Sequence, residues 1–126
     1  MISALALAGL LAATDAPRAA VAPLWAWSVY ETPSSVTLVH EVPDTDMLGA
    51  VLECARGSGK IKVTVYADPR KPQDRLTALL PAADKPFQGF LASGRLALKA
   101  ETGSAEVVLP PADKPKLDRF AKLCGV

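Results

Sequence analysis

The sequence has little of the side-chain chemistry on which most enzymes depend. It contains one His, His40, and two Cys, Cys54 and Cys124, with no Cys-x-x-Cys pair. A four-Cys zinc site and a thioredoxin-type redox motif are therefore excluded. If the two Cys pair with each other, a single His leaves no ligand set for a transition metal. We expect neither a metal nor a cofactor.

Charge of one sign is also lacking, because 14 Lys and Arg stand against 13 Asp and Glu, for a formal net charge of +1. A charge-driven nucleic-acid binder would show a clear basic excess, so no nucleic-acid partner is expected. Eleven Pro and eight Gly argue against a bundle of long helices, since Pro removes a helix hydrogen bond and clashes with the preceding turn. The hydrophobic share of 50% excludes disorder as the overall state.

The N-terminal segment is apolar but short. Residues 2–13 read ISALALAGLLAA, whereas a membrane-spanning helix needs roughly 20 apolar residues. The run matches the hydrophobic region and small-residue tail of a secretory signal peptide, although no Lys or Arg precedes it. We predict a signal peptide over residues 1–16, no stable membrane span after processing, and a periplasmic or secreted domain over residues 24–126. The alternative is a first buried strand or helix of a cytosolic protein.

Export bears on the two cysteines. Cys54 and Cys124 are 70 positions apart, and in an oxidising compartment they would most simply pair with each other. Closing a loop of that size stabilises a small domain by roughly 4 kcal/mol in the chain-entropy estimate. The alternative is a pair of buried free thiols.

Alternating hydrophobic residues predict a mainly β chain. The clearest element is a β-hairpin, in which residues 48–55 and 61–67 flank the turn sequence Arg56-Gly-Ser-Gly-Lys60. On its first strand, Leu48, Ala50, Leu52 and Cys54 are expected to share one face. Further strands are predicted over residues 24–30, 36–42, 75–80, 95–100 and 105–109.

A local repeat accompanies two predicted helices. The sequence Leu80-Pro-Ala-Ala-Asp-Lys-Pro86 recurs as Leu109-Pro-Pro-Ala-Asp-Lys-Pro115, and each copy precedes a segment with helical spacing. Asp84 and Asp113 are predicted as N-caps of these helices, and Gly94 and Gly125 as the residues that end them. In the second helix, Cys124 falls on the apolar face. The expected fold is therefore an antiparallel β-sandwich or barrel-like domain of about seven short strands with two short helices.

Candidate binding residues are few. Trp25 and Trp27 fall on one face of a predicted strand, where they can be core residues or a stacking platform for sugars or aromatic ligands. His40 lies in the middle of the next strand, where it can be a partly buried structural residue or contact a ligand. We treat these three as weak candidates for a ligand surface.

The sequence contains no complete catalytic motif of the kinds compared below. The segment Arg56–Ile61 resembles the tail of a phosphate-binding loop, but it lacks the first Gly and the Ser or Thr after Lys60. No Gly-x-Ser-x-Gly motif accompanies His40. Glu41, Asp44 and Asp46 form an acidic cluster that suits capping and turns and leaves open a carboxylate-dependent hydrolase. We assign no catalytic residue.

Several motifs together resemble a known group of proteins. Trp27, Pro43-Asp-Thr-Asp46, the segment 52–61 around Cys54, and Leu109-Pro-Pro-Ala-Asp113-Lys-Pro115 are similar to those of small, uncharacterised exported proteobacterial β-domains. The chain is more remotely similar to periplasmic accessory proteins of type VI secretion. The resemblance implies an exported all-β module without known catalytic residues, and it transfers no functional residue.

These observations predict a non-enzymatic binding or accessory domain that binds or supports another, unknown component of the cell envelope. Two alternatives stay open. One is a periplasmic inhibitor of a lysozyme-type enzyme, although the Ser-Gly-x-x-Tyr loop of such inhibitors is not matched at Ser58 or Ser93. The other is the small hydrolase that would use Glu41, Asp44 or Asp46.

Overall fold

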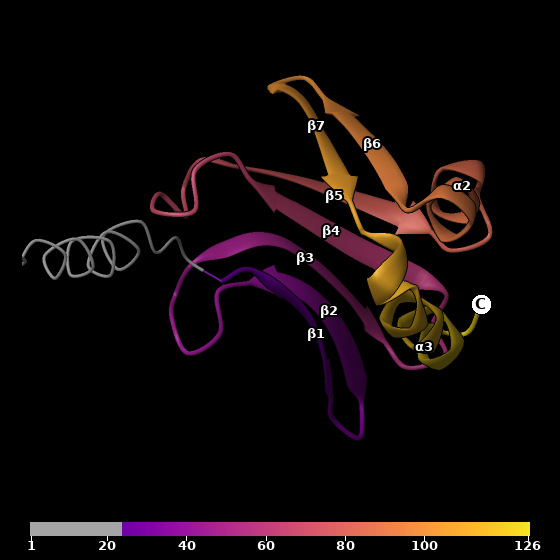
Figure 1. The fold of residues 1–126 in the computed structure, drawn as a ribbon. Coiled ribbons are helices and arrows are strands. Elements are labelled where there is room, and N and C mark those ends of the chain that lie inside the picture. The colour runs from indigo at the N-terminus through magenta and orange to yellow at the C-terminus, as the bar shows by residue number, and fades with distance from the viewer. Residues whose placement is uncertain (1–23) are drawn as a thin grey trace, which may run out of the picture.

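The computed structural model describes residues 24–126, so the predicted signal peptide lies outside the described part of the chain. This part contains seven strands and two α-helices, in agreement with the sequence pattern. Figure 1 shows how they are arranged. The elements are β1 (Ala26–Glu31), β2 (Ser35–Glu41), β3 (Leu48–Ala55), β4 (Lys60–Tyr66), β5 (Arg75–Pro81), α2 (Lys85–Ser93), β6 (Arg95–Ala100), β7 (Gly103–Val108), the 3₁₀ turn η1 (Pro111–Asp113) and α3 (Lys114–Cys124).

The strands form two antiparallel sheets. The first is a five-stranded meander in the order β1-β2-β3-β4-β5, and the second is the β6–β7 hairpin. Among the described strands, β1 and β5 are the two edges of the meander and do not pair with each other, and β6 and β7 pair only with each other. The meander therefore does not close on itself. The expectation of a sandwich-like domain is confirmed, and the barrel-like alternative is wrong.

One face of the five-stranded sheet, here called the inner face, carries the hydrophobic core. Val36, Leu38, Leu52, Ile61 and Val63 are fully buried on it. They belong to one cluster with side chains from both helices and from the hairpin, namely Phe87, Phe90, Leu96, Leu98, Val107, Leu117 and Phe120. All the later elements therefore pack on the same side of the sheet.

The predicted β3–β4 hairpin is confirmed, and its turn also has a second structural role. Gly57 and Gly59 adopt φ values of 72° and 66°, which glycine accepts without a Cβ clash. Their backbone N–H groups donate hydrogen bonds to the carbonyl oxygens of Leu123 and Cys124, at 3.0 and 2.8 Å. The turn thus satisfies carbonyl groups at the C-terminal end of α3 that have no partner within the helix.

A β-bulge changes the expected register of β3. Pairing shifts between His40 and Glu41, so that Ala50 lies opposite His40 and Leu48 lies opposite Glu41. Neighbouring residues of β2 point to opposite faces, and cross-strand partners share a face. Leu48 and Ala50 therefore lie on different faces, and the expectation that they share one is wrong. A bulge has this effect because it adds one residue to one strand.

Both helices begin and end at the predicted residues, but the predicted N-cap hydrogen bonds do not form. Gly94 and Gly125, at φ 78° and 100°, are left-handed C-caps. Neither Asp84 nor Asp113 makes a side-chain capping hydrogen bond, so the predicted capping interactions are absent. The carboxylate of Asp113 instead accepts a hydrogen bond from Lys116 Nζ at 3.1 Å.

The predicted disulfide is present. Cys54 on β3 and Cys124 at the end of α3 are bonded, and their Cα atoms are 6.0 Å apart, within the usual range. Both residues are buried, as the strand and helix patterns predict. The bond fixes the end of α3 to the middle of the sheet.

Candidate functional site

The structure brings together the three residues that the sequence suggested as ligand contacts. Trp27 and His40 are cross-strand partners, and their rings are stacked with centroids 4.8 Å apart. The ring of Trp25 lies on His40 as well, tilted by 35° at a centroid distance of 5.0 Å. Gly49 makes room for this packing, because a Cβ on it would lie 3.0 Å from His40 Nδ1.

Burial limits what this aromatic cluster can contact. Trp27 is only 4% exposed and belongs to the core, whereas Trp25 and His40 are partly exposed. Burial lowers the pKa of His40, and the nearby carboxylate of Asp113 offsets this in part. The cluster therefore packs one end of the inner face and offers only Trp25 and His40 to a ligand.

The acidic residues of the hydrolase alternative occupy different environments. Glu41 is 8% exposed, and its carboxylate accepts a hydrogen bond from the hydroxyl of Tyr30. This hydrogen bond to Glu41 is the main cause of a raised pKa for Tyr30. Asp44 and Asp46 lie exposed in the turn that precedes β3. Within residues 24–126, no group of three or more His, Cys, Asp or Glu side chains could hold a metal ion.

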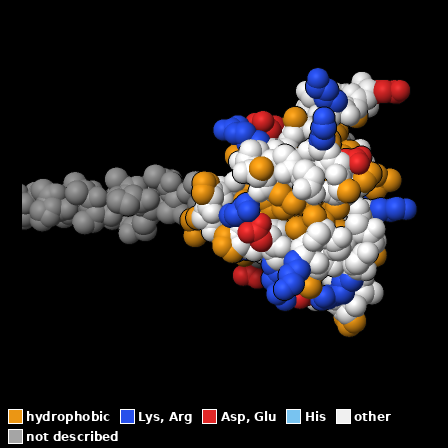
Figure 2. Space-filling model, turned by 90° about the vertical axis from the view of Figure 1, so that its right-hand side faces the viewer, with side chains coloured by type: hydrophobic (Ala, Val, Ile, Leu, Met, Phe, Trp, Pro, Cys, Tyr) orange, Lys and Arg blue, Asp and Glu red, His pale blue; other side chains and the backbone are white. Residues whose placement is uncertain are grey.

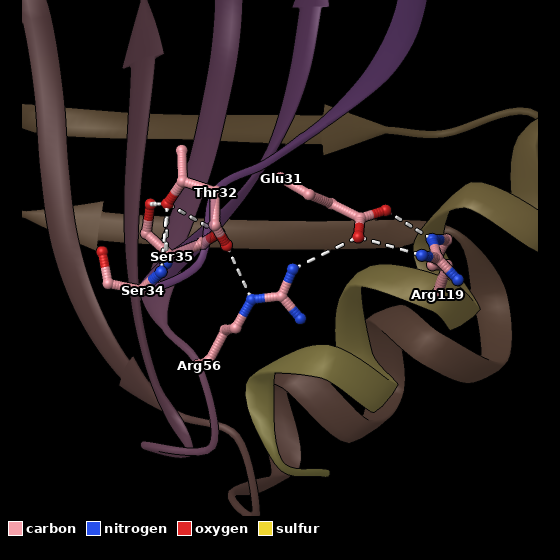
Figure 3. A network of polar contacts seen from close by, with 6 residues as sticks. All are labelled: Glu31, Thr32, Ser34, Ser35, Arg56 and Arg119. Atoms are coloured by element: carbon pink, nitrogen blue, oxygen red, sulfur yellow. Dashed lines mark hydrogen bonds and ion pairs between the residues drawn. The ribbon is translucent and has the colours of Figure 1, made fainter.

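The loop that resembles a phosphate site is engaged in structural contacts. Besides the glycine N–H groups already described, Arg56 donates from Nε to the carbonyl oxygen of Thr32 at 2.8 Å. Its Nη2 lies 3.3 Å from the carboxylate of Glu31 (Figure 3). Glu31 is in turn bound by Arg119 of α3, which lowers the pKa of its carboxyl group. These contacts tie the loop, β1 and α3 together.

A further surface was not recognised from the sequence. Both helices and the β6–β7 hairpin pack on the inner face, so within residues 24–126 no helix or strand covers the opposite face of the five-stranded sheet. We call this the outer face. Matching registers place in one row across it Tyr30, Thr37, Glu53, Lys62 and Leu79, and in the next row Ser28, Val39, Val51, Thr64 and Thr77.

The outer face is hollowed over strands β3, β4 and β5. One hollow, with a volume of about 220 Å³, is lined by Val51, Glu53, Lys62, Thr64, Tyr66, Arg75 and Thr77. A shallower one, of about 460 Å³, is lined by Ser34, Ser35, Glu53, Cys54, Ala55, Lys60, Lys62 and Leu79. Because the two share Glu53 and Lys62, they lie side by side on the outer face, and together they are here called the outer groove.

The outer groove is basic. Three cations line it, Lys60, Lys62 and Arg75, against one carboxylate, that of Glu53. The ion pairs found within residues 24–126 use other cations, on α3, on β6 and in the β3–β4 turn. The spacing Lys60-x-Lys62, opposite to buried Ile61 and Val63, was the signal in the sequence that could have indicated it.

Two other hollows are apparent. One of about 390 Å³ lies between the β4–β5 connection and the β6–β7 turn, and one of about 240 Å³ lies between the end of α2 and η1. Figure 2 faces the end of the molecule that carries α2 and α3, and hydrophobic side chains show across the middle of that view. Charged groups in these linings are few, so they offer less to orient a polar ligand than the outer groove does.

No family model, curated protein or solved structure matches this chain. Within residues 24–126, no helix has both the length and the apolar character needed to cross a membrane.

Proposed function

We propose that this protein is an exported, non-enzymatic binding domain that holds another component of the cell envelope on the outer face of its sheet. The observation that carries the proposal is the outer groove. It is a basic depression over three paired strands, with cations that form no ion pair within residues 24–126. Paired strands are rigid, and a rigid surface loses little entropy when it binds.

Export is supported by the disulfide. A bond between Cys54 and Cys124 persists in an oxidising compartment and is rare in the cytosol. Together with the signal-like N-terminal segment, it supports a periplasmic or secreted location. Mass spectrometry of the protein from its native host should find a first residue between positions 14 and 23. A soluble protein that retains Met1 would contradict export.

Binding is tested with one variant inside the groove and a matched variant outside it. The immobilised protein should retain a component of the envelope extract, and Thr77→Trp should lose it, because the bulky side chain fills the groove without changing its charge. Ala97→Trp places the same side chain at an exposed position of β6 and should retain the component. If both variants behave like the unmodified protein, or both lose the component, the outer groove is not the binding surface.

A further inference from the structure

We propose that the outer groove binds a linear anionic polysaccharide, an inference that rests on the proposed binding function. The first argument is the order of its charges. Lys60 and Lys62 are two residues apart on one strand, so their Cα atoms are separated by roughly 7 Å. Arg75 lies opposite Tyr66 towards the other end of the groove. The cations therefore follow the direction of the strands, as a linear anion requires.

The balance of charge within the groove favours an anion. Lys62 lies opposite Glu53 in the register of β3 and β4, yet no ion pair joins them. Three cations against one carboxylate leave a local excess of positive charge, although the whole chain carries only +1. The expected attraction therefore comes from the charges of the groove and not from the net charge of the chain, and salt should weaken it.

The remaining lining suits a carbohydrate. Hydroxyl groups, each able to donate and accept hydrogen bonds, occur along its length, on Ser34, Ser35, Thr64, Tyr66 and Thr77. The exposed side chain of Leu79 and the ring of Tyr66 add apolar surface against which a sugar ring can lie. Sugar hydroxyls would find partners here, and acidic groups on the sugar would meet the cations.

An extended acidic peptide fits this location less well. Peptides that bind to sheets usually add a strand at an edge, where backbone groups are free to pair. The outer groove instead lies on the face of the sheet over β3, β4 and β5, whereas the free backbone groups of the edge strand β5 point sideways, in the plane of the sheet. Bound there, a peptide would leave its backbone N–H and C=O groups to side chains and water alone. The observations therefore favour the polysaccharide.

The test compares three probes on the full chain by isothermal titration calorimetry. Polygalacturonate represents a carboxylated polysaccharide, dextran a neutral one, and polyglutamate an acidic peptide. We expect polygalacturonate to bind and added salt to weaken it, and we expect dextran not to bind and polyglutamate to bind more weakly. Lys60→Ala combined with Lys62→Ala should weaken polygalacturonate binding about tenfold or more, since two charge-assisted contacts are lost.

The control variant combines Lys99→Ala with Lys122→Ala, two exposed lysines outside the groove, and should bind like the unmodified protein. The proposal is overturned if polygalacturonate binds no better than dextran, or if the control weakens binding as much as the groove variant does. Polyglutamate binding as tightly as polygalacturonate would point to an acidic protein partner instead. If polygalacturonate does not bind while Thr77→Trp still loses the envelope component, the proposed function stands and only the ligand class is wrong.

Discussion

The guanidinium of Arg119 binds the carboxylate of Glu31 through two hydrogen bonds, at 2.6 and 2.9 Å, across 88 positions of the chain (Figure 3). Three residues earlier on the same helix, Lys116 Nζ donates to the carbonyl oxygen of Trp27 at 2.7 Å. Residues three apart lie on one helix face, so α3 presents both cations to β1. These contacts hold α3 on the inner side of the sheet and leave the outer face open.

The ion pair predicts how Glu31 titrates. Its hydrogen bonds with Arg119 lower the carboxyl pKa below the ordinary 4.5. The stabilisation is therefore present above pH 4.5 and is lost as the pH falls through the lower, folded-state pKa. NMR titration should show that Arg119→Ala raises the pKa of Glu31, whereas Arg95→Ala, which breaks the ion pair with Glu106, leaves it unchanged. An unchanged pKa in Arg119→Ala would show that the pair does not form in solution.

The disulfide predicts a large effect of reduction. Breaking the Cys54–Cys124 bond should lower the free energy of unfolding by about 2–5 kcal/mol. Hydrogen exchange should rise first in residues 117–126, because a helix of 11 residues is marginal by itself. Chemical denaturation with and without reductant measures the difference. In a variant with both cysteines replaced by Ser, the reductant should not change the free energy of unfolding. Equal stability with and without reductant would contradict the assignment.

Two glycines predict opposite effects of the same substitution. Gly125 has φ 100°, and a Cβ on it would lie 3.0 Å from backbone atoms of Gly57, so Gly125→Ala should cost about 1–3 kcal/mol. Gly89 lies inside α2 with no atom within 4 Å of an added Cβ. Gly89→Ala should therefore stabilise the protein by about 0.5–1 kcal/mol. Urea denaturation of both variants checks the pair, and an unaffected Gly125→Ala would refute the close contact between turn and helix.

The environment of His40 predicts a loss of stability in weak acid. Burial lowers its pKa below the ordinary 6.5. Between that lowered value and 6.5 the unfolded chain binds more protons than the folded one, so the free energy of unfolding falls as the pH falls. His40→Phe should lose this part of the pH dependence. NMR titration reports the pKa directly, and a value at or above 6.5 would show that the stacked ring is not desolvated.

Local patterns predicted most of the fold. Three features could be predicted because they depend on short segments, whose structure follows from periodicity and from the backbone freedom of glycine. They are the β3–β4 turn, the left-handed glycines after both helices and the inward direction of the two Cys. The bulge beside Glu41 was missed because a register depends on two strands at once. The Glu31–Arg119 pair was missed for a similar reason, since packing of distant elements brings the two side chains together.

The candidate site was predicted less well than the fold. Trp25, Trp27 and His40 do meet, but packing places Trp27 in the core. The outer groove depends on two registers, which bring Glu53, Lys62 and Thr77 together from three strands. It also depends on the packing of both helices and the β6–β7 hairpin on the inner face. Which face of the sheet the other elements cover cannot be predicted from one sequence, because a strand shows the same alternation of polar and apolar residues in both cases.

Site-specific photo-crosslinking in the native host tests the central claim, that the outer groove is the binding surface. A photoreactive side chain at Thr77 lies in the groove, and one at Ala97 lies on β6, away from it. If the outer groove is the binding surface, irradiation of intact cells should crosslink an envelope component to the photoreactive side chain at position 77 and not to the one at position 97. Crosslinks to one component from Ala97 alone, or equal yields from both positions, would contradict it.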